Sequence, residues 1–307
     1  SDAFAGRVYI RPAAVYSEME WWQVLPALPM PNEYPYQLLN KLPILCDETG
    51  VWMINRYGQL ERKGDAVAKV AASGEPDAFF ATLDEAMVVA NFLGTATVTV
   101  LADANLLMGL PILNGSDVTL TSEGSHTVSR SATCLGPMLL VLRTLRLKGG
   151  LTLDGGDASG DENRIAQIMP GGRLEMSSGV TLTGGNAGNG GAVYNQGTFR
   201  MFGGTITENA ADGVGGGVET SGGVFRMTGG TISENTADNG GGVNLSGGSM
   251  TLSGGEIIDN EAYNGGGVHC WGGATTLSGT AIRGNEADLG GGVYVRPSVA
   301  VTIKGGA

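Results

Sequence analysis

The sequence predicts an all-β protein: a right-handed parallel β-helix whose coils are about 25 residues long. Three observations predict it. Gly makes up 53 of the 307 residues, Val recurs at a fixed interval, and each interval holds three short alternating segments. The recurring valines are 25 residues apart, and each follows a triplet of small residues: Val193, Val218, Val243, Val268 and Val293. Abundant glycine without a collagen triplet indicates either disorder or a repeat, and the fixed period favours a repeat.

Further columns of equivalent residues accompany each valine. They are an aliphatic column (Leu182, Ile206, Ile232, Ile257, Ile282), an amide column (Asn209, Asn235, Asn260, Asn285), an alanine column (Ala187, Ala211, Ala237, Ala262, Ala287) and a third apolar column (Met176, Met201, Met227, Leu252, Leu277). Alternation within each segment directs one set of side chains inward and the next outward. We therefore expect three short strands per coil, with the valines and Cys270 pointing inward. The right-handed sense follows the rule for parallel crossovers.

The constant polar and glycine positions have structural explanations. Glycines allow the positive φ angles of tight corners. Stacked asparagines can form an amide ladder in which each side chain satisfies the next. We interpret the amide column as structural and not as a binding site.

The repeat resembles a known family. Ile-x-x-Asn followed by Gly-Gly-Ala-Val or Gly-Gly-Gly-Val is similar to the paired short motifs of polymorphic outer-membrane proteins and related repeat-bearing bacterial surface proteins. The matching segments are Gly190–Val193, the four later Gly-Gly-Gly-Val copies, Ile206–Asn209, Ile232–Asn235, Ile257–Asn260 and Ile282–Asn285. Ile replaces the Phe usual in that family, and the resemblance covers roughly residues 174–307. It implies a β-helical stalk of the pectin-lyase-like fold, a secreted or bacterial cell-surface location and adhesion.

The chain before the regular repeat divides into three parts. Residues 96–173 contain alternating segments separated by Gly and Asp, so they predict degenerate coils of the same helix. Residues 82–92 predict a helix that covers the first coil, since Thr82 and Glu85 form a capping box. Residues 1–78 are rich in Pro and aromatic residues and predict a small β-rich segment. Within it, Ile44–Asp47 and Val51–Ile54 suggest a hairpin, and Trp21 and Trp22 favour a packing role.

Composition limits the partners. The formal net charge is −12, which argues against nucleic acid, and no apolar stretch is long enough for a membrane span. Three widely spaced cysteines, Cys46, Cys134 and Cys270, indicate neither a disulfide framework nor a zinc site.

Two outward rows beside the valine column are candidates for a binding face. One runs Tyr194, Glu219, Asn244, His269, Tyr294, and its neighbour ends in Trp271 and Arg296. Aromatic side chains mixed with amides and charges on an exposed sheet suit a glycan or another extracellular partner, although a mixed exposed face without function has the same composition. We therefore expect a non-catalytic, adhesin-like surface or secreted protein, or a plain stalk.

Two other functions stay open. A polysaccharide lyase or glycoside hydrolase would need converging carboxylates, or a calcium site with a basic residue. The densest acidic group is Asp154, Asp157, Asp161 and Glu162, which is a weak calcium candidate beside its interpretation as a solvated loop. No other cofactor is expected.

The second alternative is an ice-binding-like face. Its threonines recur at Thr181, Thr183, Thr205, Thr207 and Thr231, with Ser233 completing the third pair, until Glu256 interrupts the row. At the other extreme of the repeat, Val299, Val301 and Ile303 begin a strand without a successor. This pattern predicts an open coil that is covered by further chain, by a partner molecule through end-to-end contact, or by a swapped segment.

Overall fold

The computed structural model describes residues 65–305 except residues 76, 114 and 157–159, together with five short strands within the first 64 residues. Strand β1 (Val8–Tyr9) pairs antiparallel with β2 (Glu18–Met19). Strands β3 (Cys46–Asp47), β4 (Gly50–Ile54) and β5 (Leu60–Gly64) form an antiparallel sheet. The β3–β4 pair confirms the predicted hairpin. Trp21 and Trp22 lie outside the described residues.

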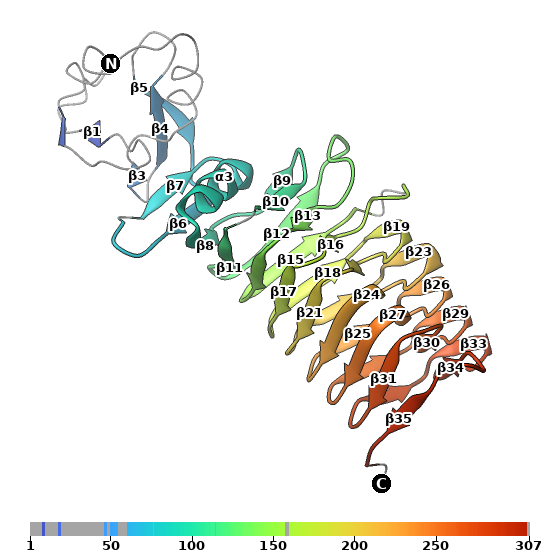
Figure 1. Ribbon diagram of the computed structural model, residues 1–307. Helices are drawn as coiled ribbons and strands as arrows, with labels where there is room; N and C mark the ends of the chain where they lie inside the picture. Colours follow the sequence, from blue (N-terminus) through green and yellow to red (C-terminus); the bar gives the residue numbers. More distant parts are fainter. Residues whose placement is uncertain are drawn as a thin grey trace.

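The remainder of the chain forms a parallel β-solenoid of about eight turns, with about 25 residues per coil (Figure 1). Its strands stack into four ladders, which we name A to D. Ladders A and B belong to one sheet, because two long strands run through both of them. Ladders C and D are separate sheets of eight and five strands.

Ladder A consists of β8 (Thr95–Val100), β11 (Asp117–Ser122), β14 (Thr144–Leu147), β17 (Arg173–Met176), β21 (Thr198–Met201), the second halves of β24 (Val218–Met227) and β27 (Val243–Leu252), β31 (Ala274–Leu277) and β35 (Val301–Ile303). Ladder B consists of β10 (Leu110–Ile112), β13 (Leu139–Val141), β16 (Ala166–Ile168), β20 (Val193–Asn195), the first halves of β24 and β27, β30 (Val268–Cys270) and β34 (Val293–Val295).

Ladder C consists of β9 (Ala104–Leu106), β12 (Ser125–Arg130), β15 (Gly150–Asp154), β18 (Val180–Thr183), β22 (Thr205–Thr207), β25 (Thr231–Ser233), β28 (Glu256–Ile258) and β32 (Ala281–Arg283). Ladder D consists of β19 (Asn186–Asn189), β23 (Ala210–Val214), β26 (Thr236–Asn239), β29 (Glu261–Asn264) and β33 (Glu286–Leu289).

The predicted columns are in register. Each repeat valine pairs with the next one along ladder B, and the aliphatic, alanine and Met/Leu columns pair in the same way along ladders C, D and A. Four of the five valines are fully buried, Val293 is partly buried, and Cys270 is fully buried. The predicted phase of the inward residues is therefore confirmed.

The number of strands per coil differs from the prediction in one half of the solenoid. The degenerate coils have three strands, from ladders A, C and B. The regular coils have four, because the residues after each asparagine form the extra ladder D. The expectation of three strands per coil is therefore wrong for residues 186–295. The segments Ala210–Val214 and Thr236–Asn239 contain Gly, Asp and Asn and have low β-propensity. Register with their neighbours makes them strands.

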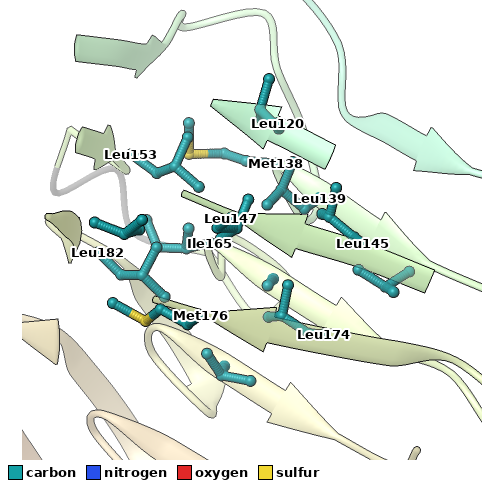
Figure 2. Close-up of a cluster of buried hydrophobic side chains, with 14 of the residues drawn as sticks. Leu120, Met138, Leu139, Leu145, Leu147, Leu153, Ile165, Leu174, Met176 and Leu182 are labelled. Atoms are coloured by element: carbon teal, nitrogen blue, oxygen red, sulfur yellow. The ribbon is translucent and has the colours of Figure 1, made fainter. Parts of the chain in front are cut away.

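The interior of the degenerate coils is filled by hydrocarbon. Figure 2 shows Leu120, Leu139, Leu145, Leu147 and Leu174 pointing into one cluster from ladders A and B, and all five are fully buried. The regular coils add two buried phenylalanines, Phe199 and Phe225, whose rings stack with centroids 5.1 Å apart. Cys134 and Cys270 are free, buried thiols.

The predicted helix covers the first coil. Helix α3 (Leu83–Leu93) begins after Thr82, whose hydroxyl accepts a hydrogen bond from the Glu85 N–H at 3.3 Å, and it ends at Gly94. Its residues Leu83, Ala86, Met87 and Ala90 are buried in the solenoid core. Strand β6 (Ala68–Ala71) pairs antiparallel with β8 and with β7 (Ala78–Phe80), so the first edge of ladder A is also covered. The sequence did not predict this strand.

The last coil is open among the described residues. Strand β35 pairs with β31, but Ile303 is 73% exposed and Val301 is only partly buried. No residues between 296 and 305 fold over the coil end as a compact cap. End-to-end contact through this coil stays a prediction.

Candidate functional site

The predicted binding row lies along the outer side of ladder B. Register pairs Gln167 with Tyr194, Tyr194 with Glu219, Glu219 with Asn244, Asn244 with His269, and His269 with Tyr294. We call these six residues the ladder B row. Consecutive members are one coil apart, about 4.8 Å. Gln167 comes from a degenerate coil, and its place in the row was not visible without the register.

The centre of this row is buried, which the sequence did not predict. Glu219, Asn244 and His269 are 2%, 0% and 3% exposed, whereas Tyr194 and Tyr294 are half-buried. The expectation of an exposed row is therefore wrong for the three central residues.

The glycine turn before each valine packs closely against its own coil. Gly240 has a φ of 67°, and a Cβ placed there would lie 2.5 Å from the Val243 carbonyl oxygen and 3.0 Å from the Asn244 Cβ. Gly215 and Gly265 make equally close approaches to the backbone of their own coils. Gly190 and Gly290 make the same approach beside the half-buried Tyr194 and Tyr294, so the turn requires glycine at every coil but does not by itself bury the central residues.

A hydrogen-bonded chain joins the three buried residues. The Asn244 side-chain nitrogen donates to Glu219 Oε2 and to Ser246 Oγ, the latter at 2.9 Å. The Asn244 Oδ1 atom lies 2.5 Å from His269 Nδ1. Because the Asn244 nitrogen donates to Glu219, its oxygen must accept, which places a proton on His269 Nδ1. The network thus fixes the orientation of the amide and of the imidazole.

Burial shifts the titration of both ends of this chain. It raises the pKa of Glu219 to about 7, against smaller lowering effects of hydrogen bonds from Asn244, Ser246 and the Thr220 backbone. Burial lowers the pKa of His269. The carboxyl group therefore changes its charge near neutral pH, and the imidazole is held neutral.

Aromatic and cationic side chains lie at the two ends of the row. The His269 ring stacks with Tyr294 at 5.2 Å and lies 6.0 Å from Trp271. The Arg296 guanidinium lies 4.0 Å from the centre of the Trp271 ring, and Trp271 is 50% exposed. At the other end, the Arg164 guanidinium lies 4.9 Å from the centre of the Tyr194 ring. These contacts fix the exposed aromatic faces in position.

The acidic loop does not form a metal site among the described residues. Asp154 accepts a hydrogen bond from the Gly156 N–H at 2.8 Å, and Glu162 pairs with Arg164, which also bonds to Gln167 at 3.0 Å. Asp157 lies outside the described residues. Calcium binding by Asp154, Asp157, Asp161 and Glu162 stays a prediction.

The threonine face is longer than the sequence indicated. Register aligns Thr127, Thr152, Thr181, Thr205 and Thr231 in one column of ladder C, and Glu256 ends it. The neighbouring column mixes Ser129, Asp154, Thr183, Thr207 and Ser233 before Ile258. The first two threonines were missed because the degenerate coils have no constant period.

A shallow pocket opens on ladder A near the N-terminal cap. It has a volume of about 390 Å³ and is lined by Ala71, Ala72, Ser73, Thr95, Ala96, Thr97, Asp117, Thr119 and Arg146. Arg146 pairs with Asp117 and lies 3.2 Å from Glu175. The sequence contained a partial signal for this face: Arg200 and Arg226 each directly precede a residue of the Met/Leu core column, whereas Arg146 precedes Leu147, which only the register pairs with Met176.

No model of a known protein family, no curated protein and no solved structure matches this chain.

Among the described residues, no helix has the length and apolar character that crossing a membrane requires.

Proposed function

We propose that this chain is a non-catalytic binding module of a bacterial surface or secreted β-helix protein, and that it binds a glycan or another extracellular partner along the ladder B row. One observation carries the proposal. The row places the half-buried Tyr194 and Tyr294 on either side of a fixed polar network, and Trp271 and Arg296 form its exposed margin.

The chemistry of the row suits a sugar chain. Aromatic faces pack against apolar C–H surfaces, while fixed polar groups hydrogen-bond hydroxyls. Tyr294 and Trp271 supply the first feature, and the partly buried Ser246, whose hydroxyl the buried Asn244 side chain holds at 2.9 Å, supplies the second. Tyr194 and Tyr294 are four coils apart, which is about 19 Å along the axis. This length accommodates a linear oligosaccharide that runs parallel to the solenoid.

The enzyme alternative is supported by Glu219, whose pKa of about 7 suits a general acid. Glycoside hydrolysis requires a second carboxylate opposite the first. The hydrogen bonds of Glu219 instead come from Asn244, Ser246 and the Thr220 backbone. These contacts favour a structural, hydrogen-bonding carboxyl group over a catalytic pair.

Retention on a panel of immobilised neutral and acidic polysaccharides tests the proposal, with the products analysed for chain cleavage. We expect at least one glycan to retain the chain, and Trp271→Ala or Tyr294→Ala to weaken its affinity about five- to tenfold. Tyr263→Ala is the matched control, because Tyr263 is 59% exposed and lies on ladder D. It should leave retention unchanged.

Two results would contradict the proposal. Cleavage that is abolished by Glu219→Gln, Asp154→Ala or Asp161→Ala would establish an enzyme. Absence of retention on every glycan and on extracellular protein partners would leave a plain stalk.

Ice binding is the second candidate, because the threonine column of ladder C spans five coils. A regular threonine row is one way to order water on a flat sheet. Thermal hysteresis that is lost in Thr205→Lys and kept in Tyr294→Ala would favour it. Absence of hysteresis in the unmodified chain would remove it.

A further inference from the structure

Four arginines gather on the outer side of ladder A. Arg146, Arg200 and Arg226 belong to one register column, in which Glu175 separates the first two, and Arg173 lies beside Glu175 on the same strand. We call these four residues the arginine column. It lies on ladder A, whereas the ladder B row lies on the other ladder of the same sheet.

The carboxylates on this face do not balance the arginines. Glu175 lies 3.2 Å from Arg146, 3.5 Å from Arg200 and 4.0 Å from Arg173, so three guanidinium groups share one carboxylate. Arg146 also pairs with Asp117. Four arginines against two carboxylates give a local net charge of +2 on a chain whose formal net charge is −12.

The excess positive charge is concentrated at the C-terminal end of the column. Arg226 is exposed and has no acidic partner among the described residues, and Arg200 is one coil away. The Arg200 Nε atom is buried and makes no hydrogen bond within the part of the chain that the structure describes. Arg200 and Arg226 are thus one coil apart, about 4.8 Å, and have no carboxylate between them. Arg146 and Arg200, in contrast, share Glu175.

Hydroxyl groups continue the column in both directions. Thr97 and Thr119 precede Arg146, and Thr251 and Thr276 follow Arg226, all in the same register. The first two line the 390 Å³ pocket, which Arg146 and Asp117 also line. A continuous row of polar side chains therefore runs along ladder A from the pocket, through Arg146, Arg200 and Arg226, to Thr251 and Thr276. We call it the ladder A row.

We propose that the ladder A row binds a linear polysaccharide that carries carboxylate groups, with one carboxylate bound between Arg200 and Arg226. The argument is charge complementarity. The protein already pairs Arg146 with Asp117 and Glu175, and Arg200 with Glu175, and a ligand carboxylate between Arg200 and Arg226 would extend the same alternation by one coil. Arginine binds carboxylates in a bidentate, geometrically defined manner. The flanking threonines would bond the sugar hydroxyls.

Nucleic acid fits this surface less well. Duplex DNA carries one charge per about 1.7 Å, and its binding requires many basic contacts. A local charge of +2 within a chain of charge −12 suits a sparsely charged polymer instead. Duplex DNA is therefore one of the comparison polymers in the test of this proposal.

The test measures binding of polygalacturonate to the full chain by isothermal titration calorimetry, at about 0.05 M and about 0.5 M sodium chloride. Neutral dextran, dextran sulfate and duplex DNA are the comparison polymers. We expect polygalacturonate to bind at low salt and to weaken at high salt. The double variant Arg200→Gln, Arg226→Gln should lower its affinity about tenfold or more. Arg226→Gln alone should lower it less and leave the fold intact, because Arg226 is exposed and unpaired among the described residues.

Two controls isolate the surface. Arg283→Gln makes the same charge change on ladder C, where Arg283 pairs with Glu256, and it should not alter affinity. Trp271→Ala changes the exposed margin of the ladder B row and should not alter the affinity for polygalacturonate either, so failure of this proposal and failure of the proposed function are distinguishable. The proposal is overturned if polygalacturonate does not bind, if Arg283→Gln weakens binding as much as Arg226→Gln, or if dextran sulfate or DNA binds in its place.

Discussion

The degenerate and the regular coils of the solenoid differ in the side chains that fill their interiors and in the constancy of their length. In the degenerate coils, three strands surround hydrocarbon, and equivalent residues of ladder A are 22, 27 and 29 residues apart: Thr95, Asp117, Thr144 and Arg173. In the regular coils, four strands surround hydrocarbon on one side and a buried asparagine ladder on the other. There the spacing stays between 25 and 26 residues: Arg173, Thr198, Val224, Ser249 and Ala274.

The asparagine ladder explains why the regular coils keep their length. Asn235 Oδ1 accepts from the Asn209 backbone N–H and side chain at 3.1 and 2.9 Å, and the Asn235 side chain donates to Asn260, Ile206 and Ser233. Each amide therefore joins two coils and closes the corner before ladder D. An insertion would break this chain of bonds, whereas apolar side chains tolerate variable spacing. The polar contacts of the asparagine ladder thus set the length of each coil, and apolar side chains fill its interior.

The largest expected effect comes from breaking the ladder in its middle. Asn235→Ala should lower the free energy of unfolding by about 5 kcal/mol, because several buried groups lose their partners at once. Leu147→Ala, in the degenerate coils, should cost about 3 to 4 kcal/mol through its cavity. Asn105→Ala, at an exposed position, is the control and should change stability by less than about 0.5 kcal/mol. Urea unfolding of the three variants tests the comparison, and a smaller cost for Asn235 than for Leu147 would contradict it.

The glycine turns provide the next effect. Gly240→Ala should cost about 4 kcal/mol, since the new Cβ meets the Val243 carbonyl at 2.5 Å and the φ of 67° is unfavourable. Gly171→Ala is the matched control in a degenerate coil, because Gly171 has a φ of 85° but no atom within 4 Å of the added Cβ. It should cost only about 1 to 2 kcal/mol. Equal losses would show that the regular coils do not depend on close turn packing.

Glu219 makes the stability of the regular coils depend on pH. Its folded pKa of about 7 lies above the usual 4.5, so the folded state favours the protonated carboxyl. The contribution is fully present below about pH 4.5 and is lost as pH rises through about 7, with an amplitude of up to about 3 kcal/mol.

The lowered pKa of His269 acts in the opposite direction, because stability from a neutral buried imidazole falls as pH drops below its usual 6.5. The difference between the unmodified chain and Glu219→Gln isolates the carboxyl effect. We expect urea unfolding to show a relative stability gain for Glu219→Gln on going from pH 5 to pH 8. A constant difference between the two proteins would refute the assignment.

The smallest effect concerns the residue before each asparagine. Glu208, Glu234 and Asp259 have φ values of 55–56°, whereas Gly184 and Gly284 take the equivalent position in the flanking coils. Glu234→Gly should therefore stabilise the chain by about 0.5 to 1 kcal/mol. Glu286→Gly, within a strand of ladder D, should destabilise it by a similar amount. The thermal midpoints of the two variants should move in opposite directions, and a shared direction would contradict this explanation.

The sequence by itself determined the repeat, its inward columns and the cap helix. The reason is that the valine, isoleucine and asparagine positions recur at a constant interval, and that Thr82 and Gly94 are local signals of a helix start and end. It also located five of the six residues of the ladder B row, all but Gln167, because outward neighbours of an inward column follow from alternation.

Only the tertiary structure decided which of these outward residues are accessible. Glu219, Asn244 and His269 are buried in register between Tyr194 and Tyr294 of the flanking coils, and no local pattern encodes that stacking. The tertiary structure alone likewise revealed the arginine column, the fourth strand of the regular coils and the extended threonine column. Arg146 and Arg200 are 54 residues apart in the sequence, and they share Glu175 only because coils of unequal length stack in register. Stacking converts positions that are remote in the chain into neighbours about 4.8 Å apart, and that conversion requires the whole solenoid.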